Sequence, residues 1–295
     1  MRTAGLAMVA LLSIGCGGGT PIASPSSEAP STAPTSGATP EPTVVEPTAD
    51  LAHPVGIIAM GHSALTGEGT GGVFEAVPSN SYATGTNPEV NSIYLRLVAV
   101  VPETEGHVRN VAVGGAPASG LAQQARTALS SEPVPLLAIV HTVDNDIRCD
   151  HENVGAVGES LASALGIIRD ASPNTVILVV GQPGRPSVDF VEAVVAADPS
   201  QKANLTWDDA CTFYTADGNI NPPGFDNLTA AIDAYEAETA RVCGLVAGCF
   251  TDGGVRRTWV DKLEYYAPDF AHFNIEGQAA EAEQLWPVVE EILGL

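Results

Sequence analysis

Short runs of apolar and β-branched residues recur along the chain, and each run stops at a glycine or at a polar cluster. Val55–Met60, Val108–Val113, Leu136–Val140 and Thr175–Val180 all have this pattern. An uninterrupted apolar run of this length is typical of a strand that is buried on both faces of a sheet. The pattern therefore predicts four buried strands.

A second periodicity, with apolar residues three or four positions apart, predicts helices around these strands. It is present over 154–168 and over Gly277–Leu293, and Asn227 is a candidate N-cap of a further helix that buries Ile232 and Tyr235. Strands that alternate with helices indicate an α/β fold with a parallel sheet covered on both faces. Such sheets bind ligands at the carboxyl ends of their strands. Polar clusters directly follow the first three predicted strands, which places a candidate site there.

The N-terminus has the features of an export signal. Met1 and Arg2 precede an apolar run over Ala4–Ile14, which is too short to span a bilayer as a helix. The run ends near Cys16 in a sequence that resembles a bacterial lipobox, so we predict a signal peptide over 1–16 and lipidation of Cys16. An ordinary cleaved signal, which would release a secreted protein, is the alternative.

Residues 17–50 form a separate segment rich in Pro, Ser and Thr. The segment holds 7 Pro and 11 Ser or Thr, and it has no Lys or Arg. It has too few large apolar side chains to offset its chain entropy, and its prolines favour extended backbone. We therefore predict a disordered tether over 17–50, a catalytic domain over 51–295 and an extracytoplasmic location at the cell surface.

Charge excludes some classes of partner. The chain has 12 Lys and Arg against 35 Asp and Glu, for a net charge of −23. Such a polyanion repels nucleic-acid backbones and anionic lipid surfaces. We expect no nucleic-acid partner, contact with a membrane only through the N-terminal lipid anchor, and a monomer.

Four cysteines lie in the predicted domain, and in an exported protein an even number indicates disulfides. Three pairings are possible. Cys243 and Cys249 are close in sequence and are flanked by glycines, which favours that pair and leaves Cys149 with Cys211. The second bridge would fix a long irregular region over 181–222. Zinc binding is less favoured because the chain lacks a CxxC pair.

Four short segments follow one another along the chain, three of them at predicted strand ends. The segments are Gly61-His62-Ser63-Ala64, Asn110–Ala116, Val143-Asp144-Asn145-Asp146 and Asp269–Gly277. In this order they resemble the blocks of the SGNH (GDSL-like) hydrolase family, and they span most of the predicted domain. The resemblance implies a three-layer α/β/α sandwich with a parallel, flavodoxin-like five-stranded sheet.

The resemblance implies a role for each matching residue. Ser63 corresponds to the nucleophile, His272 to the base that activates it, and Asp269 to the residue that orients the base. The family's oxyanion donors correspond to the backbone N–H groups of Ser63 and Gly115 and to the side chain of Asn145. Gly114 is the alternative to Gly115, because the two glycines are adjacent. Taken singly, Ser63 and Asn145 also fit turn or capping roles.

Three positions depart from the family pattern. His62 stands where Asp is usual, Val143 where Gly is usual, and Phe273 where Pro is usual. None of these changes removes a group that the chemistry requires. Adjacent side chains usually diverge, so we interpret His62 as a supporting or pocket-wall residue rather than the base, and we include Asp144 and Asp146 among the supporting candidates.

Two other motifs are set aside. Gly67–Gly72 contains GxGxxG, but it begins several residues past a strand and contains Glu68, so we interpret it as a loop bordering the pocket and not as a dinucleotide site. Asp144, Asp146 and Asp150 lack the Gly and Glu of a calcium loop. We expect no metal and no cofactor.

The sequence thus predicts an exported serine ester hydrolase. It would act through an acyl-serine intermediate on a small-molecule, carbohydrate or lipid ester. The alternatives are an acyltransferase on the same scaffold and a binding module that keeps the fold without catalysis.

Overall fold

The structure is a computed structural model that describes residues 53–206 and 209–295. The predicted signal peptide over 1–16, Cys16 and the tether over 17–50 lie outside the described residues.

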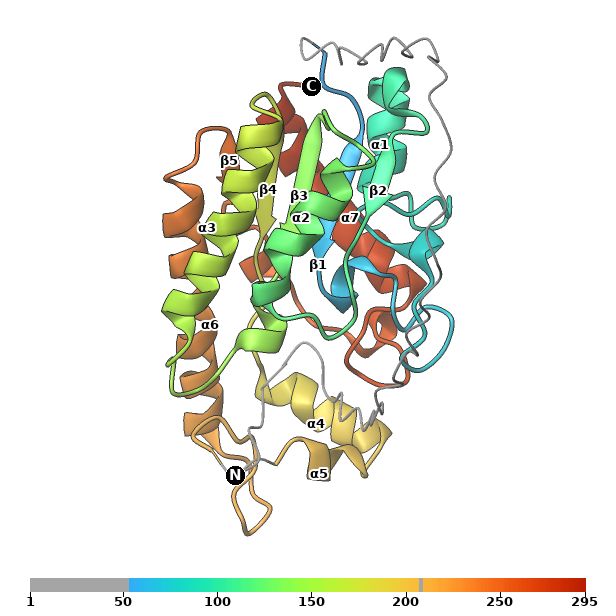
Figure 1. Ribbon diagram of the computed structural model, residues 1–295. Coiled ribbons are helices and arrows are strands. Elements are labelled where there is room, and N and C mark those ends of the chain that lie inside the picture. Colours follow the sequence, from blue (N-terminus) through green and yellow to red (C-terminus); the bar gives the residue numbers. More distant parts are fainter. Residues whose placement is uncertain (1–52, 207–208) are drawn as a thin grey trace, which may run out of the picture. The chain divides into compact units, whose positions relative to one another are not determined.

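Within the described ranges, five parallel strands form one sheet in the order β2-β1-β3-β4-β5. This is the flavodoxin-like order, and it confirms the expected fold class (Figure 1). All four predicted strands are present. The fifth strand, β5, was not predicted, because it is too short to form an apolar run and Phe250 at its centre is exposed. The strands are β1 (Ile57–Gly61), β2 (Val108–Asn110), β3 (Leu137–His141), β4 (Val176–Val180) and β5 (Cys249–Thr251).

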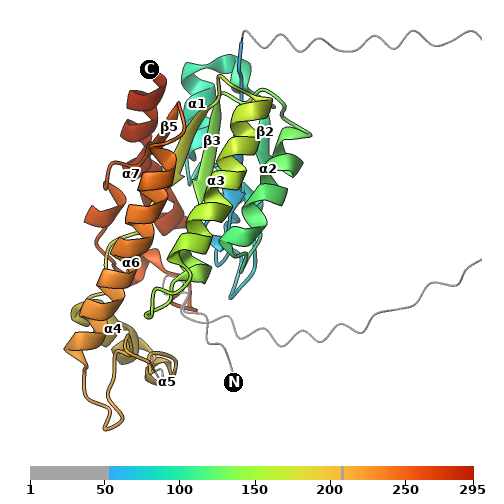
Figure 2. The same cartoon turned by 60° about the vertical axis from the view of Figure 1, so that its left-hand side comes forward.

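Alternate side chains of the central strands enter two separate cores. Ile58 and Met60 of β1 pack with residues of α2 (Leu121–Leu129), α3 (Val154–Ala171) and α6 (Pro222–Cys243). Ile57 and Ala59 instead pack with α1 (Ile93–Val100) and α7 (Ile275–Leu293). Figure 2 shows α2 and α3 on one side of the sheet and α7 on the other. A sheet buried on both faces requires the continuous apolar runs seen in the sequence.

The helix predicted over 154–168 and the C-terminal helix are both confirmed. Asn274 caps α7 by accepting a hydrogen bond from the N–H of Gly277 at 3.0 Å. The predicted cap at Asn227 is wrong, because α6 begins at Pro222 and Asn227 lies within it. Prolines at Pro222 and Pro223 fix φ near the helical value and start the helix earlier.

The region 181–222 is less irregular than the sequence suggested. It contains α4 (Val188–Ala197) and the short α5 (Gln201–Asn204). The Oγ atom of Ser187 caps α4 by accepting a hydrogen bond from the N–H of Phe190 at 3.2 Å, a helix start that was not predicted from the sequence. None of the described helices has the length and apolar content needed to cross a membrane.

Both predicted disulfides are present. Cys149 and Cys211 are joined across 62 residues with their Cα atoms 6.0 Å apart, and Cys243 and Cys249 are joined with Cα atoms 5.3 Å apart. The first ties the segment after β3 to the end of the 181–222 region. The second links the end of α6 to β5.

Candidate active site

Ser63 lies at the carboxyl end of β1, in the first turn of a 3₁₀ helix over Ser63–Leu65. The chain turns at Gly61, whose φ of +143° and close approach to the carbonyl of His141 leave no room for a Cβ. The side chain of Gln124 holds this turn, because its Oε1 accepts from the N–H of Gly61 at 2.6 Å and its Nε2 donates to the carbonyl of Gly61 at 2.9 Å. No sequence motif marks Gln124 as part of the site, because its amide acts through hydrogen bonds to the backbone of Gly61.

His62 is buried beside Ser63 and caps the same turn. Its Nδ1 accepts from the N–H of Ala64 at 3.3 Å, and its Nε2 lies 3.4 Å from Oδ2 of Asp144. A side-chain acceptor at this position is what the turn needs, and Asp is a common choice there. The imidazole supplies that acceptor, so the departure at His62 preserves the local cap.

Val143 has the backbone conformation that glycine favours. Its φ of +87° is rare for a β-branched residue, and its carbonyl accepts from the N–H groups of Asp146 and Ile147 at 2.8 and 3.1 Å. The side chain of Val143 is buried in the core. The position therefore keeps the conformation that the SGNH pattern implies, and burial of the valine offsets the strain.

The segment after β3 is attached to the loop after β2. Asn145 donates from Nδ2 to the carbonyl of Ala116 at 3.1 Å, and Oδ2 of Asp146 accepts from the N–H of Ala118 at 2.7 Å. Burial raises the pKa of Asp146, partly offset by that backbone hydrogen bond. Gly115 in this loop has a φ of +72°, which only glycine adopts readily. These contacts hold together the two segments that carry the predicted oxyanion donors, the side chain of Asn145 and the backbone N–H of Gly115.

Asp269 and His272 form a hydrogen-bonded pair on the segment before α7. The carboxylate accepts from the N–H groups of Ala271 and His272, each at 2.9 Å, and its Oδ2 lies 3.1 Å from Nδ1 of His272. Burial alone would raise the pKa of Asp269, but the hydrogen bonds from His272 and Ala271 outweigh it and lower that pKa. Phe270 between them has a φ of +54°, so the turn that builds this pair includes a rare backbone conformation.

A pocket of about 340 Å³ brings Ser63, His272, Asp144 and Glu68 together. Asp269 lies behind His272 and outside the lining, and Gly115 and Asn145 are not lining residues either. In the described part of the chain no hydrogen bond joins Ser63 to His272. The Nε2 atom of His272 instead lies 3.8 Å from Oε1 of Glu68. The loop that carries Glu68 thus borders the pocket, as its sequence suggested.

Buried ionisable side chains form the deep wall of this pocket, and none of them was predicted from the sequence. Arg256 and Glu281 are fully buried and pair at 2.7 Å. Tyr82 and His141 lie next to them, with the hydroxyl 2.9 Å from Nδ1 of His141. Burial raises the pKa of Glu281 to about 7, with Arg256 opposing the shift. Burial lowers the pKa of His141, and the charge of His62 lowers it further.

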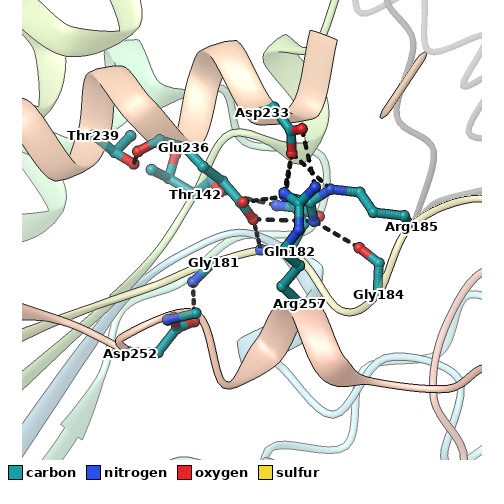
Figure 3. A network of polar contacts seen from close by, with 11 residues as sticks. Thr142, Gly181, Gln182, Gly184, Arg185, Asp233, Glu236, Thr239, Asp252 and Arg257 are labelled. Carbon is teal, nitrogen blue, oxygen red and sulfur yellow. Dashed lines mark hydrogen bonds and ion pairs between the residues drawn. The ribbon is translucent and has the colours of Figure 1, made fainter. Parts of the chain in front are cut away.

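The loop after β4 closes another side of the pocket through Pro183. Its position is fixed by the polar network in Figure 3. The N–H of Gly181 donates to Asp252 at 2.8 Å, and the N–H of Gln182 donates to Glu236 at 2.8 Å. Arg185 pairs with Asp233 and Glu236 of α6. The network anchors this loop to β5 and α6, so the wall of the pocket is set by backbone hydrogen bonds.

One group of potential metal ligands comes together within residues 53–206 and 209–295, and it consists of Cys149, Asp209 and Cys211. The two cysteines are already joined as a disulfide, so they offer no thiolate to a metal ion.

The fold is shared with bacterial lipases of known structure. Phospholipase A1 from Streptomyces albidoflavus NA297 is 14% identical and matches 81% of this chain and 99% of its own with a TM-score of 0.50. The extracellular lipase from Streptomyces rimosus is 15% identical and matches the same shares with a TM-score of 0.51. No family model and no curated protein matches the sequence. At these identities the likeness establishes the fold alone, and that fold agrees with the three-layer α/β/α sandwich that the resemblance implied.

Proposed function

We propose that the protein is a serine ester hydrolase with Ser63 as nucleophile, His272 as general base and Asp269 as the residue that orients the base. The observation that carries the proposal is the meeting of Ser63 and His272 in one pocket, with Nδ1 of His272 held by Asp269 at 3.1 Å. The likeness in fold to lipases supports the same reaction class.

The orientation of His272 determines the direction of proton transfer. With Nδ1–H donated to Asp269, the Nε2 lone pair faces the pocket and can accept the Ser63 proton as the hydroxyl attacks the ester carbonyl. His272 then returns that proton to the leaving alcohol, and water cleaves the acyl-serine. In unliganded sites such hydrogen bonds are often long and shorten when substrate binds.

The developing oxyanion requires donors that are already in place. The backbone N–H groups of Ser63 and Gly115 and the side chain of Asn145 fill this role in the proposal. One N–H of the Asn145 amide is used by Ala116, and this bond fixes the plane of the amide while the second N–H stays available.

The proposal includes export of the protein, which a separate set of observations supports. Two disulfides support an oxidising compartment, and the apolar N-terminal run supports a signal that delivers the domain there. Lipidation at Cys16 would then hold the domain at the cell surface through the segment 17–50.

The test compares Ser63→Ala with Ser131→Ala, which removes a hydroxyl from an exposed site outside the pocket. Labelling by a fluorophosphonate probe and turnover of a short-chain aryl ester are measured, with circular dichroism to establish folding. We expect Ser63→Ala to lose labelling and at least about 10³-fold in kcat, while Ser131→Ala keeps both. Normal turnover by folded Ser63→Ala would refute the assignment.

A further inference from the structure

The carboxylate of Glu68 lies between the proposed base and the loop after β2. Its Oε1 is 3.8 Å from Nε2 of His272, and a Cβ placed on Gly114 would lie 2.5 Å from its Oε2. The side chain is 15% exposed and lines the same pocket as Ser63. Glu68 is therefore a largely buried negative charge beside the reacting groups, and the proposed mechanism does not use it.

The backbone of the Glu68 loop sets this position. Glu68 pairs with Ala76 in an antiparallel bridge, and the N–H of Gly69 donates to the carbonyl of Glu75 at 3.0 Å. Gly69 has a φ of +89°, and a Cβ there would lie 2.7 Å from Cβ of His272. Only glycine permits this approach. The loop is thus packed against His272, and it presents Glu68 to Nε2.

An aromatic side chain from the same loop lies on the same histidine. The rings of Phe74 and His272 are 5.7 Å apart at 85°, an edge-to-face contact, and Phe74 is 45% exposed. A carboxylate and an exposed aromatic ring therefore both border His272.

We infer that Glu68 and Phe74 form the subsite for the alcohol part of the ester, and that they select alcohols carrying a positive charge. The inference rests on the proposed function, in which Nε2 of His272 protonates the leaving alcohol. Groups that border Nε2 must then border that alcohol. A carboxylate attracts a cation directly, an aromatic ring attracts it through its face, and the net charge of −23 draws cations toward the protein.

The positive charge of Arg256, which also lies at this pocket, does not neutralise the negative charge of Glu68. Arg256 also lines the pocket, but it is fully buried and pairs with Glu281 at 2.7 Å. An anionic alcohol would meet the Glu68 carboxylate without a compensating partner at the mouth, so such esters should be excluded.

The experiment uses two esters of the same shape that differ in charge, acetylcholine and 3,3-dimethylbutyl acetate. We expect the protein to prefer the cationic ester by at least about fivefold in kcat/KM, because one charge pair at about 4 Å has this effect even in water and a larger one at a partly buried site. Glu68→Gln should bring this ratio near one. The matched control is Glu75→Gln, which removes the same charge from an exposed position on the same loop and should keep the ratio.

The outcomes separate the two proposals. If the aryl ester is not turned over and the fluorophosphonate probe does not label Ser63, the hydrolase assignment fails. If only the two acetates are not cleaved, the hydrolase assignment stands, and in either case the subsite is tested by calorimetric binding of tetramethylammonium to the Ser63→Ala and Ser63→Ala/Glu68→Gln proteins, where equal binding to both would overturn the inference. A fall in both rates with an unchanged ratio would make Glu68 structural and overturn the inference. A preference for glycerol monoacetate that depends on Glu68, without a charge preference, would also overturn it. Glu68→Asp, which keeps the charge, should retain part of the preference and serves if the Gln variant fails to fold.

Discussion

Two histidine–aspartate pairs meet at this end of the sheet, and they differ in the ring nitrogen that faces the carboxylate. His272 turns Nδ1 toward Asp269 at 3.1 Å and leaves Nε2 at the pocket. His62 turns Nε2 toward Asp144 at 3.4 Å, and its Nδ1 accepts from the N–H of Ala64. Nδ1 of His62 is used by the turn and its Nε2 is buried facing Asp144, whereas Nε2 of His272 faces the pocket. The nitrogen left free, and not closeness in sequence to Ser63, decides which histidine can act as base.

The carboxylates of the two pairs, Asp269 and Asp144, also differ, because their pKa values are shifted in opposite directions. Backbone N–H groups and the imidazole lower the pKa of Asp269 despite its burial, so it stays ionised and can stabilise a protonated His272. Burial raises the pKa of Asp144, and the attraction of His62 only partly offsets the shift. In the proposed mechanism the first pair therefore transfers the proton and the second supports the turn that carries Ser63.

Replacing each histidine by asparagine should separate the pairs most strongly. His272→Asn removes the base, and we expect kcat to fall by at least about 10³-fold. His62→Asn keeps a side-chain acceptor for Ala64, so kcat should fall by no more than about tenfold. Both rates are measured with the short-chain aryl ester. Losses of equal size in two folded variants would mean that the pairs share the chemistry, contrary to the proposal.

The aspartates should show the same contrast with a smaller effect. Asp269→Asn replaces the acceptor of the Nδ1 proton by an amide that can turn its NH₂ toward the ring and favour the wrong tautomer, and kcat should fall on the order of 10³-fold. Asp144→Asn keeps a side chain of the same shape, with an oxygen that can face Nε2 of His62 at 3.4 Å, so kcat should stay within about fivefold. Single-turnover kinetics would locate the loss in the chemical step. A larger loss at Asp144 than at Asp269 would reverse the assignment.

The sequence predicted most of this end of the sheet because each element has a local signal. Apolar runs locate β1, β3 and β4, and the polar residues that follow them, such as Ser63 and Asp144, fall at the site for that reason. His272 lies more than 200 residues from Ser63, and only the family resemblance linked the two. The local pattern therefore predicts where the strands end, but it does not show which distant loop lies beside those ends in the fold.

The deep wall of the pocket could not be predicted, because its residues matter only through their partners. Glu281 lies on the buried face of α7 beside Ala282, and its full burial is possible only because it pairs with Arg256. Gln124 likewise lies on an amphipathic helix, and its contacts with Gly61 arise only when that helix packs on β1. A buried polar side chain has no one-dimensional signature, since pairing across the fold is what makes its burial possible.

Stability as a function of pH offers the finest comparison of the two carboxylates. The folded pKa of Asp269 is lowered, so its contribution to the free energy of unfolding is present above its unfolded pKa of about 3.9 and is lost as pH falls through the folded value. The folded pKa of Asp144 is raised, so its contribution is fully present below about pH 3.9 and is lost as pH rises through the folded value. The two groups therefore have opposite pH dependences.

Urea unfolding of Asp269→Asn and Asp144→Asn between pH 3 and pH 7 measures this difference. The destabilisation caused by Asp269→Asn should be largest near pH 7, at about 1–2 kcal/mol, and should shrink toward pH 3. Asp144→Asn should instead gain stability relative to the unmodified protein as pH rises, because the amide carries no charge that burial would penalise. Two curves with the same sign of slope would show that the carboxylates experience the same environment, and the division between a reactive pair and a supporting pair would then lose its electrostatic basis.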